Sequence, residues 1–250
     1  MTRYKLTLAY DGRPFSGWQS QRGGNTIQDV IERAVASLSG QPARVHASGR
    51  TDAGVHALGQ VAHFDPPAEC RLNEMDWHRG LNALLPPTIR VMRCEQSEPD
   101  FHSRFDVRGK VYRYRLWHGE VLPPLESGLA WHLYGPLDGK LLREAAHVFK
   151  GRHDFTVFSA NRREEAEEKI DKIRTLHEVT LFHDGELIEL TFGGDGFLYK
   201  MVRMIVGAAV HAARGRTSID RLLDLLKNPQ QKKPGWQAPA DGLYLVRVDY

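Results

Sequence analysis

The sequence predicts a mixed α/β fold (α+β) made of two similar halves. Segments in which apolar and polar residues alternate, as in strands, take turns along the chain with segments whose apolar residues repeat at a helical spacing. With 250 residues, of which 41% are hydrophobic, the chain is long enough to bury a sizeable core. A polar, acidic stretch over residues 95–100 indicates the join, and we place the two domains at residues 1–104 and 105–250.

The first half predicts the order strand, helix, strand, strand, helix, strand, which is the order of a ferredoxin-like fold. Thr26 is a good N-cap for the first helix, an apolar stripe runs from Ile27 to Leu38, and Gly40 ends it. The second helix stops at the two prolines that follow Leu85. We expect strands at residues 4–10, 43–47, 60–64 and 89–94, and the second helix at residues 73–85.

The second half repeats this alternation loosely. The dipeptide Asp184-Gly185 predicts a tight hairpin between two strands, and Ser218 is a good N-cap for a late helix. Residues 162–174 contain five basic and five acidic side chains, which predicts a solvated surface segment. We expect strands at residues 107–117, 174–184, 186–192 and 242–249, and helices at residues 137–149, at residues 198–213 and after Ser218.

The composition excludes several classes of protein. The chain has 34 Lys and Arg against 31 Asp and Glu, and the resulting net charge of +3 does not by itself indicate a nucleic-acid partner. Two cysteines without Cys-x-x-Cys spacing are too few for a disulfide scaffold, and the N-terminal residues do not resemble a signal peptide. The most apolar stretch, residues 201–213, is too short to span a membrane. We therefore expect a cytoplasmic protein.

The common cofactor and metal motifs are missing from the sequence. The 12 histidines form no His-Glu-x-x-His pattern and no cluster with cysteines, so no metal site is expected. No glycine-rich pattern for ATP or a dinucleotide follows a strand, and no Gly-x-Ser-x-Gly turn is present. If the protein is an enzyme, we expect it to work without a cofactor.

The loop predicted over residues 48–59 carries the first candidate for chemistry. Its residues 49–56 read Gly-Arg-Thr-Asp-Ala-Gly-Val-His, so Asp52 stands between two glycines that permit a sharp bend and the close approach of another molecule. A nearby guanidinium, from Arg50, would hold this carboxylate ionised, as a nucleophile or a base requires. Thr-Asp-Ala-Gly is also ordinary turn chemistry, and the pattern alone favours a bare turn.

Arg203 is the second candidate, because it interrupts an otherwise apolar run over residues 201–210. A buried arginine requires a carboxylate partner, since an isolated buried charge is costly. Asp52 is one possible partner and Asp195, just upstream, is another. A side chain that reaches the surface along its own aliphatic stem is the third explanation.

A strand of alternating aromatic and basic residues, within residues 110–117, is the third candidate. Tyr112 faces one side of this strand and Arg113 the other. Aromatic rings beside basic side chains are suited to stacking on unpaired RNA bases. Arg104 adds basic charge, and Lys200 lies in a run, residues 197–216, that contains no acidic residue. The same alternation is typical of any half-exposed strand, so both explanations stay open.

The run over residues 49–56 is a highly specific motif of a known protein family. Further segments match motifs of the same family, at residues 10–12 with Phe15, 17–19, 26–28, 59–61, 101–105, 112–114, 154–155, 201–203 and 242–244. Together these segments resemble the tRNA pseudouridine synthase A family over nearly the whole chain. The sequence departs from the usual family pattern at three positions. Lys200 and Met204 replace a His and an Asn, and Val157 replaces a small polar residue, so these departures bear on the local RNA contacts that the resemblance implies and not on the chemistry that it implies.

The resemblance implies two ferredoxin-like, RRM-like halves with a central, mostly antiparallel sheet and a catalytic cleft between them. It implies that Asp52 is the nucleophile, that Tyr112 packs on the target uracil and that Arg203 pairs with the aspartate. Arg50 would position the RNA or flip the base. The resemblance also implies a homodimer that acts on uridines in the anticodon stem-loop of tRNA, with no cofactor and no metal. Further RNA contacts are expected from Arg104, Arg113 and Lys200.

Two other functions compete with this hypothesis. A non-catalytic RNA-binding protein would explain the aromatic and basic strand equally well, but it leaves an acidic side chain at the centre of a basic site unexplained. A hydrolase with paired carboxylates lacks a second well-placed acid near Asp52.

Pseudouridine has the same atoms as uridine, so its formation needs no redox partner. The carboxylate can add to C6 of the base or support cleavage at C1′, and the sequence leaves both routes open.

Overall fold

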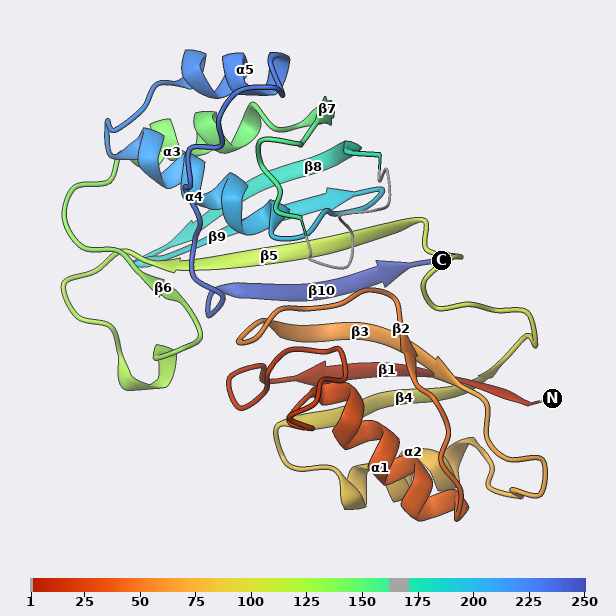
Figure 1. Ribbon diagram of the computed structural model, residues 1–250. Helices are drawn as coiled ribbons and strands as arrows, with labels where there is room; N and C mark the ends of the chain where they lie inside the picture. Colours follow the sequence, from red (N-terminus) through yellow and green to blue (C-terminus); the bar gives the residue numbers. More distant parts are fainter. Residues whose placement is uncertain (1, 162–170) are drawn as a thin grey trace. The chain divides into compact units, whose positions relative to one another are not determined.

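The computed structural model describes residues 2–161 and 171–250, which fold into two compact units (Figure 1). The first unit contains the chain up to Arg108 together with Tyr244–Tyr250, and the second contains the described part of Gly109–Leu243. The sequence places the division after residue 104, whereas the first unit keeps four more residues and takes back the last seven. Long-range pairing explains the difference, because the backbone N–H of Arg108 donates to the carbonyl of Asp249 at 2.9 Å.

The first unit has the predicted ferredoxin-like element order. Strand β1 lies between β3 and β4 and is antiparallel to both, while β2 pairs antiparallel with one end of β3. At the other end of β3, strand β10 adds a parallel pair in which Tyr244 lies opposite His56. The elements are β1 (Arg3–Tyr10), α1 (Ile27–Ser39), β2 (His46–Ala47), β3 (His56–Phe64), α2 (Glu74–Leu84), β4 (Ile89–Ser97) and β10 (Leu243–Asp249).

Helices α1 and α2 lie side by side on one face of this sheet (Figure 1). The face that they cover includes alternate residues of β1, all four of which are buried. The predicted boundaries of α1 are confirmed: the side chain of Thr26 accepts a hydrogen bond from the backbone N–H of Asp29, and Gly40 ends the helix with φ +76°. The buried side chains of the helices and of β1 include Tyr4, Leu6, Leu8, Tyr10, Ile27, Ile31, Val35, Trp77 and Leu81.

Several strand boundaries in this unit differ from the prediction. Strand β3 begins at His56 instead of residue 60, because its first residues pair with both β1 and β10. The loop before it is therefore shorter, and the strand expected at residues 43–47 is reduced to the two residues of β2. Strand β4 continues to Ser97, into the stretch predicted as the join between the halves. In each case the pairing partner is distant in sequence, so local patterns do not reveal it.

The second unit is also a mixed α/β structure. Its sheet has the antiparallel order β5-β9-β8-β7, with β6 parallel to β5, and the predicted hairpin at Asp184-Gly185 joins β8 to β9. The sequence misses β6 and β7, because strands of two and four residues are too short to show a period. The elements are β5 (Gly109–Trp117), a short 3₁₀ helix (Pro124–Glu126), β6 (Trp131–His132), α3 (Gly139–His147), β7 (Gly151–Asp154), β8 (Ile173–Asp184), β9 (Leu187–Gly194), α4 (Met201–Ala213) and α5 (Ile219–Lys227).

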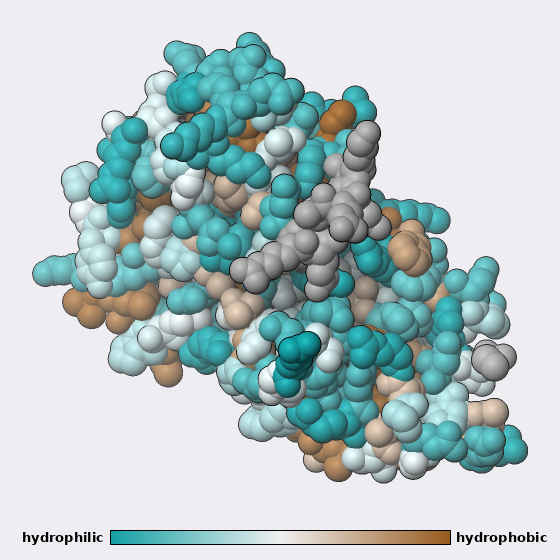
Figure 2. Space-filling model, viewed as in Figure 1, coloured by the Kyte–Doolittle hydropathy of each residue, from teal (hydrophilic) through white to brown (hydrophobic). Residues whose placement is uncertain are grey.

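Helix α4 is the core element of the second unit, and it is buried at 11 of its 13 positions. Arg203, in its first turn, is one of the two positions that keep partial exposure. In the part of the chain that the structure describes, no helix is both long and apolar enough to cross a membrane. Hydrophilic residues cover most of the visible surface (Figure 2). The solvated segment predicted at residues 162–174 lies mostly outside the described residues.

Candidate active site

The loop between β2 and β3 holds Asp52, and buried hydrogen bonds fix the backbone on both sides of it. The side-chain amide of Gln60 donates to the carbonyl of Gly49 at 2.9 Å and to the phenol oxygen of Tyr10 at 3.3 Å. The same phenol lies 2.8 Å from the hydroxyl of Thr51. Both Tyr10 and Gln60 are buried. The residues before Asp52 are thus held by side chains from two different strands, since Tyr10 of β1 contacts Thr51 and Gln60 of β3 contacts Gly49.

A second segment, residues 12–18, packs closely against the same loop. The backbone N–H of Trp18 donates to the carbonyl of Thr51 at 3.0 Å. A Cβ atom on Gly17 would lie 2.8 Å from that carbonyl oxygen, and one on Gly12 would lie 2.1 Å from the carbonyl oxygen of Val55. Side chains at these two positions would displace the loop, so the glycines near the N-terminus serve the placement of Asp52.

Asp52 itself is half-buried at the start of a turn. The backbone N–H of Val55 donates to the carbonyl of Asp52 at 3.1 Å, and Gly54 has a positive φ of +78°. The turn predicted from Thr-Asp-Ala-Gly therefore exists, and it lies on a rigid support that leaves the aspartate partly exposed. Arg50, on the same loop, is exposed.

The strand that follows the loop begins with His56, whose imidazole lies beside the carboxylate of Asp11. The Nδ1 atom of His56 accepts a hydrogen bond from the backbone N–H of Gly12 at 3.3 Å and lies 3.4 Å from a carboxylate oxygen of Asp11. The imidazole ring stacks on Tyr244 with 4.6 Å between ring centroids. Burial acts to raise the pKa of Asp11, but hydrogen bonds from Arg13 outweigh it and the pKa is lowered. Asp11 therefore carries a negative charge at neutral pH.

In the second unit, Arg203 is attached at two points to the segment that precedes β10. Its Nε atom donates to the carbonyl of Ala238 at 2.9 Å, and the N–H of Ala238 donates back to the carbonyl of Arg203 at 2.9 Å. Asp195, the alternative partner suggested by the sequence, accepts hydrogen bonds from the backbone N–H of Thr175 at 3.0 and 3.1 Å. The carboxylate of Asp195 therefore anchors strand β8.

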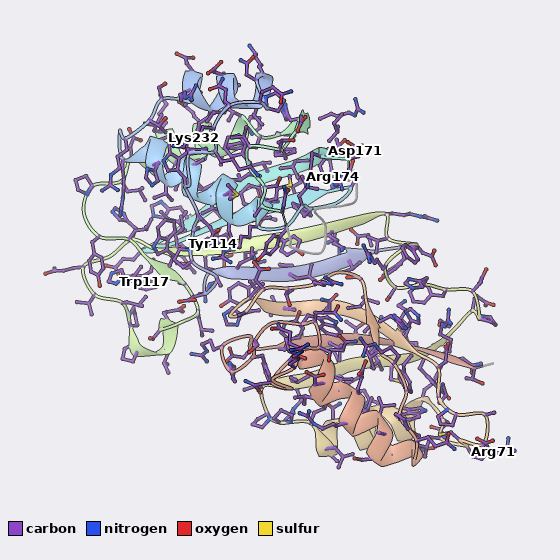
Figure 3. All side chains as sticks on the ribbon, in the orientation of Figure 1. Arg71, Tyr114, Trp117, Asp171, Arg174 and Lys232 are labelled. Carbon is purple, nitrogen blue, oxygen red and sulfur yellow. The ribbon has the colours of Figure 1, made fainter. Side chains whose placement is uncertain are left out.

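Strand β5 carries both tyrosines of the predicted aromatic strand, with Tyr114 labelled in Figure 3. Tyr112 meets the ring of Phe197 edge to face at 4.8 Å. The phenol of Tyr114 donates to the carbonyl of Pro239 at 2.9 Å, and burial raises its pKa well above the ordinary value while nearby Arg203 acts in the opposite direction. Tyr114 and Arg203 thus hold neighbouring residues of one segment, residues 238–239.

The three basic residues expected to contact RNA lie in different environments. Arg104 is exposed, on the segment after β4. Lys200 directly precedes α4 in a left-handed conformation with φ +61°, which is uncommon for a residue other than glycine. Arg113 lies on the opposite side of β5 from Tyr112, and its guanidinium is 3.5 Å from the carboxylate of Glu189. An RNA phosphate at Arg113 would compete with that carboxylate.

The sequence indicates Asp52 as the candidate nucleophile, but it does not indicate the side chains that hold its loop. Gln60 is a polar residue at a buried position of an apolar strand, which is the signal that could have revealed it. The supporting role of Tyr10 gives no such signal, because the residue fits the regular alternation of its strand. Within residues 2–161 and 171–250, no group of three or more His, Cys, Asp or Glu side chains is placed to hold a metal ion.

Comparison with known proteins now assigns the family. A family model described as tRNA pseudouridine synthase matches residues 7–106 and 145–250. The tRNA pseudouridine synthase A of Akkermansia muciniphila is 47% identical over 253 residues, covering 100% of this chain and 96% of its own. That of Solibacter usitatus is 43% identical over 250 residues and covers all of both chains.

Among solved structures, a chain in the crystal structure of a Cbf5-Nop10-Gar1 complex matches 97% of this chain and 49% of its own length. Its sequence identity is 15% and its TM-score is 0.42, so the family assignment depends on the sequence matches. The chain belongs to the tRNA pseudouridine synthase family, whose members are isomerases that act on tRNA.

Proposed function

We propose that this chain converts uridine to pseudouridine in the anticodon stem-loop of tRNA, with Asp52 as the nucleophile. The observation that carries the proposal is the placement of a half-buried carboxylate on a loop whose neighbouring residues are held by Tyr10 and Gln60. Such rigid support is what a nucleophile needs, because small displacements of a reacting group lower the rate strongly.

The reaction balances without any added reagent. The bond between N1 of uracil and C1′ of the ribose breaks, the base rotates, and a bond forms between C5 and C1′. The proton on C5 is lost and N1 takes up a proton, so no electrons enter or leave. Asp52 can add to C6 of the ring or capture C1′, and in both routes the carboxylate leaves again at the end.

The remaining roles follow from the family resemblance. Tyr112 offers an aromatic face for the flipped uracil and a phenol for the proton on C5. Arg203 is the proposed partner that keeps Asp52 ionised, and Arg50 helps to flip the base. Arg104 and Lys200 would contact phosphates, with a weaker contribution from Arg113 because Glu189 competes for it. A homodimer in the cytoplasm is also proposed from the resemblance.

The test separates an enzyme from an RNA-binding protein that lacks catalysis. Asp52→Asn keeps the size of the side chain and removes its nucleophilic charge. We expect the variant to fold and to bind unmodified tRNA with a Kd close to that of the parent protein, but to form no pseudouridine. Release of tritium from tRNA labelled at C5 of uridine measures the reaction, and filter binding measures the Kd.

Glu69→Gln is the matched control, because it removes an exposed carboxylate of the same unit away from the loop. It should keep full activity. Full activity of Asp52→Asn would overturn the proposed nucleophile. If the parent protein binds tRNA and forms no pseudouridine, the RNA-binding alternative replaces the proposal as a whole.

A further inference from the structure

A short turn in the first unit exposes a large aromatic side chain on a rigid support. Phe105 has 73% of its surface exposed. Among the described residues, this is the largest exposed fraction of any Phe, Tyr or Trp. The turn is closed by two hydrogen bonds, from the N–H of His102 to the carboxylate of Asp106 at 2.7 Å and from the N–H of Asp106 to the carbonyl of His102 at 3.1 Å. An aromatic ring held in water by a fixed backbone suggests a binding role.

The turn is also anchored to the sheet beneath it. The hydroxyl of Ser103 donates to the carbonyl of His46 at 2.6 Å, and its backbone N–H donates to Nδ1 of His63 at 3.1 Å. The phenol of Tyr250 donates to the carbonyl of Ser103 at 2.7 Å. These contacts come from β2, β3 and the C-terminal residue, so the position of the turn is set by three distant parts of the chain.

One planar ring and one cation lie next to Phe105, and a second ring lies beyond the first. The ring of His102 lies 4.2 Å from it at an angle of 33°, and the guanidinium of Arg104 lies 5.7 Å from its centroid. The exposed ring of His46 follows at 5.8 Å from His102. Burial and the neighbouring His46 and Arg3 lower the pKa of His102, which leaves its ring neutral at pH 7. We call His46, His102, Arg104 and Phe105 the His–Phe platform.

We propose that the His–Phe platform binds an unpaired base of the tRNA substrate, with the base stacked on Phe105 and Arg104 contacting the adjacent phosphate. The inference depends on the proposed function only in taking tRNA as the ligand. Aromatic, imidazole and guanidinium planes are the surfaces on which proteins stack splayed RNA bases. The positive charge of Arg104 suits a phosphodiester neighbour and not an apolar protein partner.

The platform lies at the opposite end of β3 from the catalytic loop. The loop leads into His56, the first residue of the strand, whereas the turn is attached to His63 near its last residue. Seven residues at about 3.3 Å each give a separation of about 23 Å along the strand. The bound base therefore belongs to a nucleotide several positions away from the uridine that reacts.

Binding to unmodified full-length tRNA tests the platform. We expect Phe105→Ala to raise the Kd about tenfold, as loss of one stacked base predicts, and to raise KM by more than it lowers kcat. Phe105→Trp should retain the parent Kd within about threefold, because a larger ring preserves stacking. Irradiation of the complex with ultraviolet light, followed by mass spectrometry, should show a peptide containing Phe105 crosslinked to an unpaired nucleotide.

Phe182→Ala is the matched control, since Phe182 on β8 is 60% exposed and belongs to neither the platform nor the proposed active site. It should leave the Kd unchanged. An unchanged Kd for Phe105→Ala, in a protein that forms pseudouridine, would overturn the platform and leave the proposed function intact. Absence of pseudouridine formation by the parent protein would instead overturn the proposed function.

Discussion

The phenol oxygen of Tyr10 lies 2.8 Å from the hydroxyl oxygen of Thr51, in a buried contact that links the end of β1 to the residue before Asp52. Burial raises the pKa of Tyr10 to about 12, although its hydrogen bonds to Thr51 and Gln60 act in the opposite direction. The phenol therefore stays protonated at neutral pH. Its role in the proposed mechanism is to position the loop and not to exchange a proton with the substrate.

Tyr10→Phe should lower both stability and turnover. The change leaves the buried polar atoms of Thr51 and Gln60 with one partner fewer, which costs about 1–3 kcal/mol of unfolding free energy. Because the loop then loses part of its support, we expect kcat to fall about tenfold with a smaller change in KM. Urea unfolding and tritium release measure the two effects.

Tyr4→Phe is the control for this prediction. Tyr4 is also buried on β1, and its phenol donates to the carbonyl of Leu72 at 2.9 Å, away from the loop that carries Asp52. This variant should lose stability and keep kcat. Equal losses of kcat in both variants would show that activity follows general stability, and the positioning role of Tyr10 would be wrong.

Gly17→Ala should displace the loop that carries Asp52, because residues 12–18 pack against it. The residue has φ +90°, and an added Cβ would lie 2.8 Å from the carbonyl oxygen of Thr51. We expect a loss of at least about 2 kcal/mol of unfolding free energy, because a backbone strain and a steric overlap are combined, together with a clear loss of kcat.

Gly24→Ala separates the two causes. Gly24 also has a positive φ, +63°, but an added Cβ would meet no atom within 4 Å. This variant should lose about 1 kcal/mol through backbone strain alone and retain its activity. Similar activity in the two variants would contradict the idea that the close approach of Gly17 places the loop.

The two tyrosines of β5 allow the proposed proton transfer to be tested. Tyr112→Phe keeps the aromatic face and removes the phenol, so kcat should fall about 100-fold while the Kd for tRNA stays close to the parent value. Tyr114→Phe removes the buried phenol that donates to the carbonyl of Pro239, and should reduce stability with little effect on kcat. Unchanged turnover in Tyr112→Phe would remove the proton-transfer role of that residue.

The features predicted well from the sequence are those with local causes. Helix α1 is bounded by the cap at Thr26 and the glycine at residue 40, and the β8–β9 hairpin is fixed by Asp184-Gly185. The short strands β6 and β7 depend on partners outside their own segment and leave no periodic pattern, and β2 is shorter than the strand expected at residues 43–47. Glycine-rich sequence and the Arg-Thr-Asp run indicate where Asp52 lies.

The support of the candidate site could not be predicted in the same way. Tyr10 and Gln60 are 50 positions apart in the sequence, and their contact becomes evident only once β1 and β3 are paired. The anchoring of Ser103 by His46 and His63 is hidden for the same reason. Contacts of this kind follow from the register of a sheet, which is set by the whole unit.

His63 should make the stability of the protein depend on pH. Burial, with smaller effects from Arg3, His102 and His46, lowers its pKa to about 4, and Asp65 only partly opposes this shift. The unfolded chain therefore takes up a proton near pH 6.5, before the folded chain does. Stability from this group is complete above pH 6.5 and falls by about 3 kcal/mol as the pH is lowered to 4.

His63→Asn provides the comparison, because its side-chain oxygen can accept the hydrogen bond from the N–H of Ser103 and does not titrate. The unfolding free energy in urea, measured between pH 4 and 7.5, should fall more steeply with acid in the parent protein than in the variant. The lowered pKa of His102 contributes in the same direction in both proteins, so the difference between the two curves reports His63 together with its coupling to His102. Parallel curves would show that His63 takes up its proton equally in the folded and unfolded states.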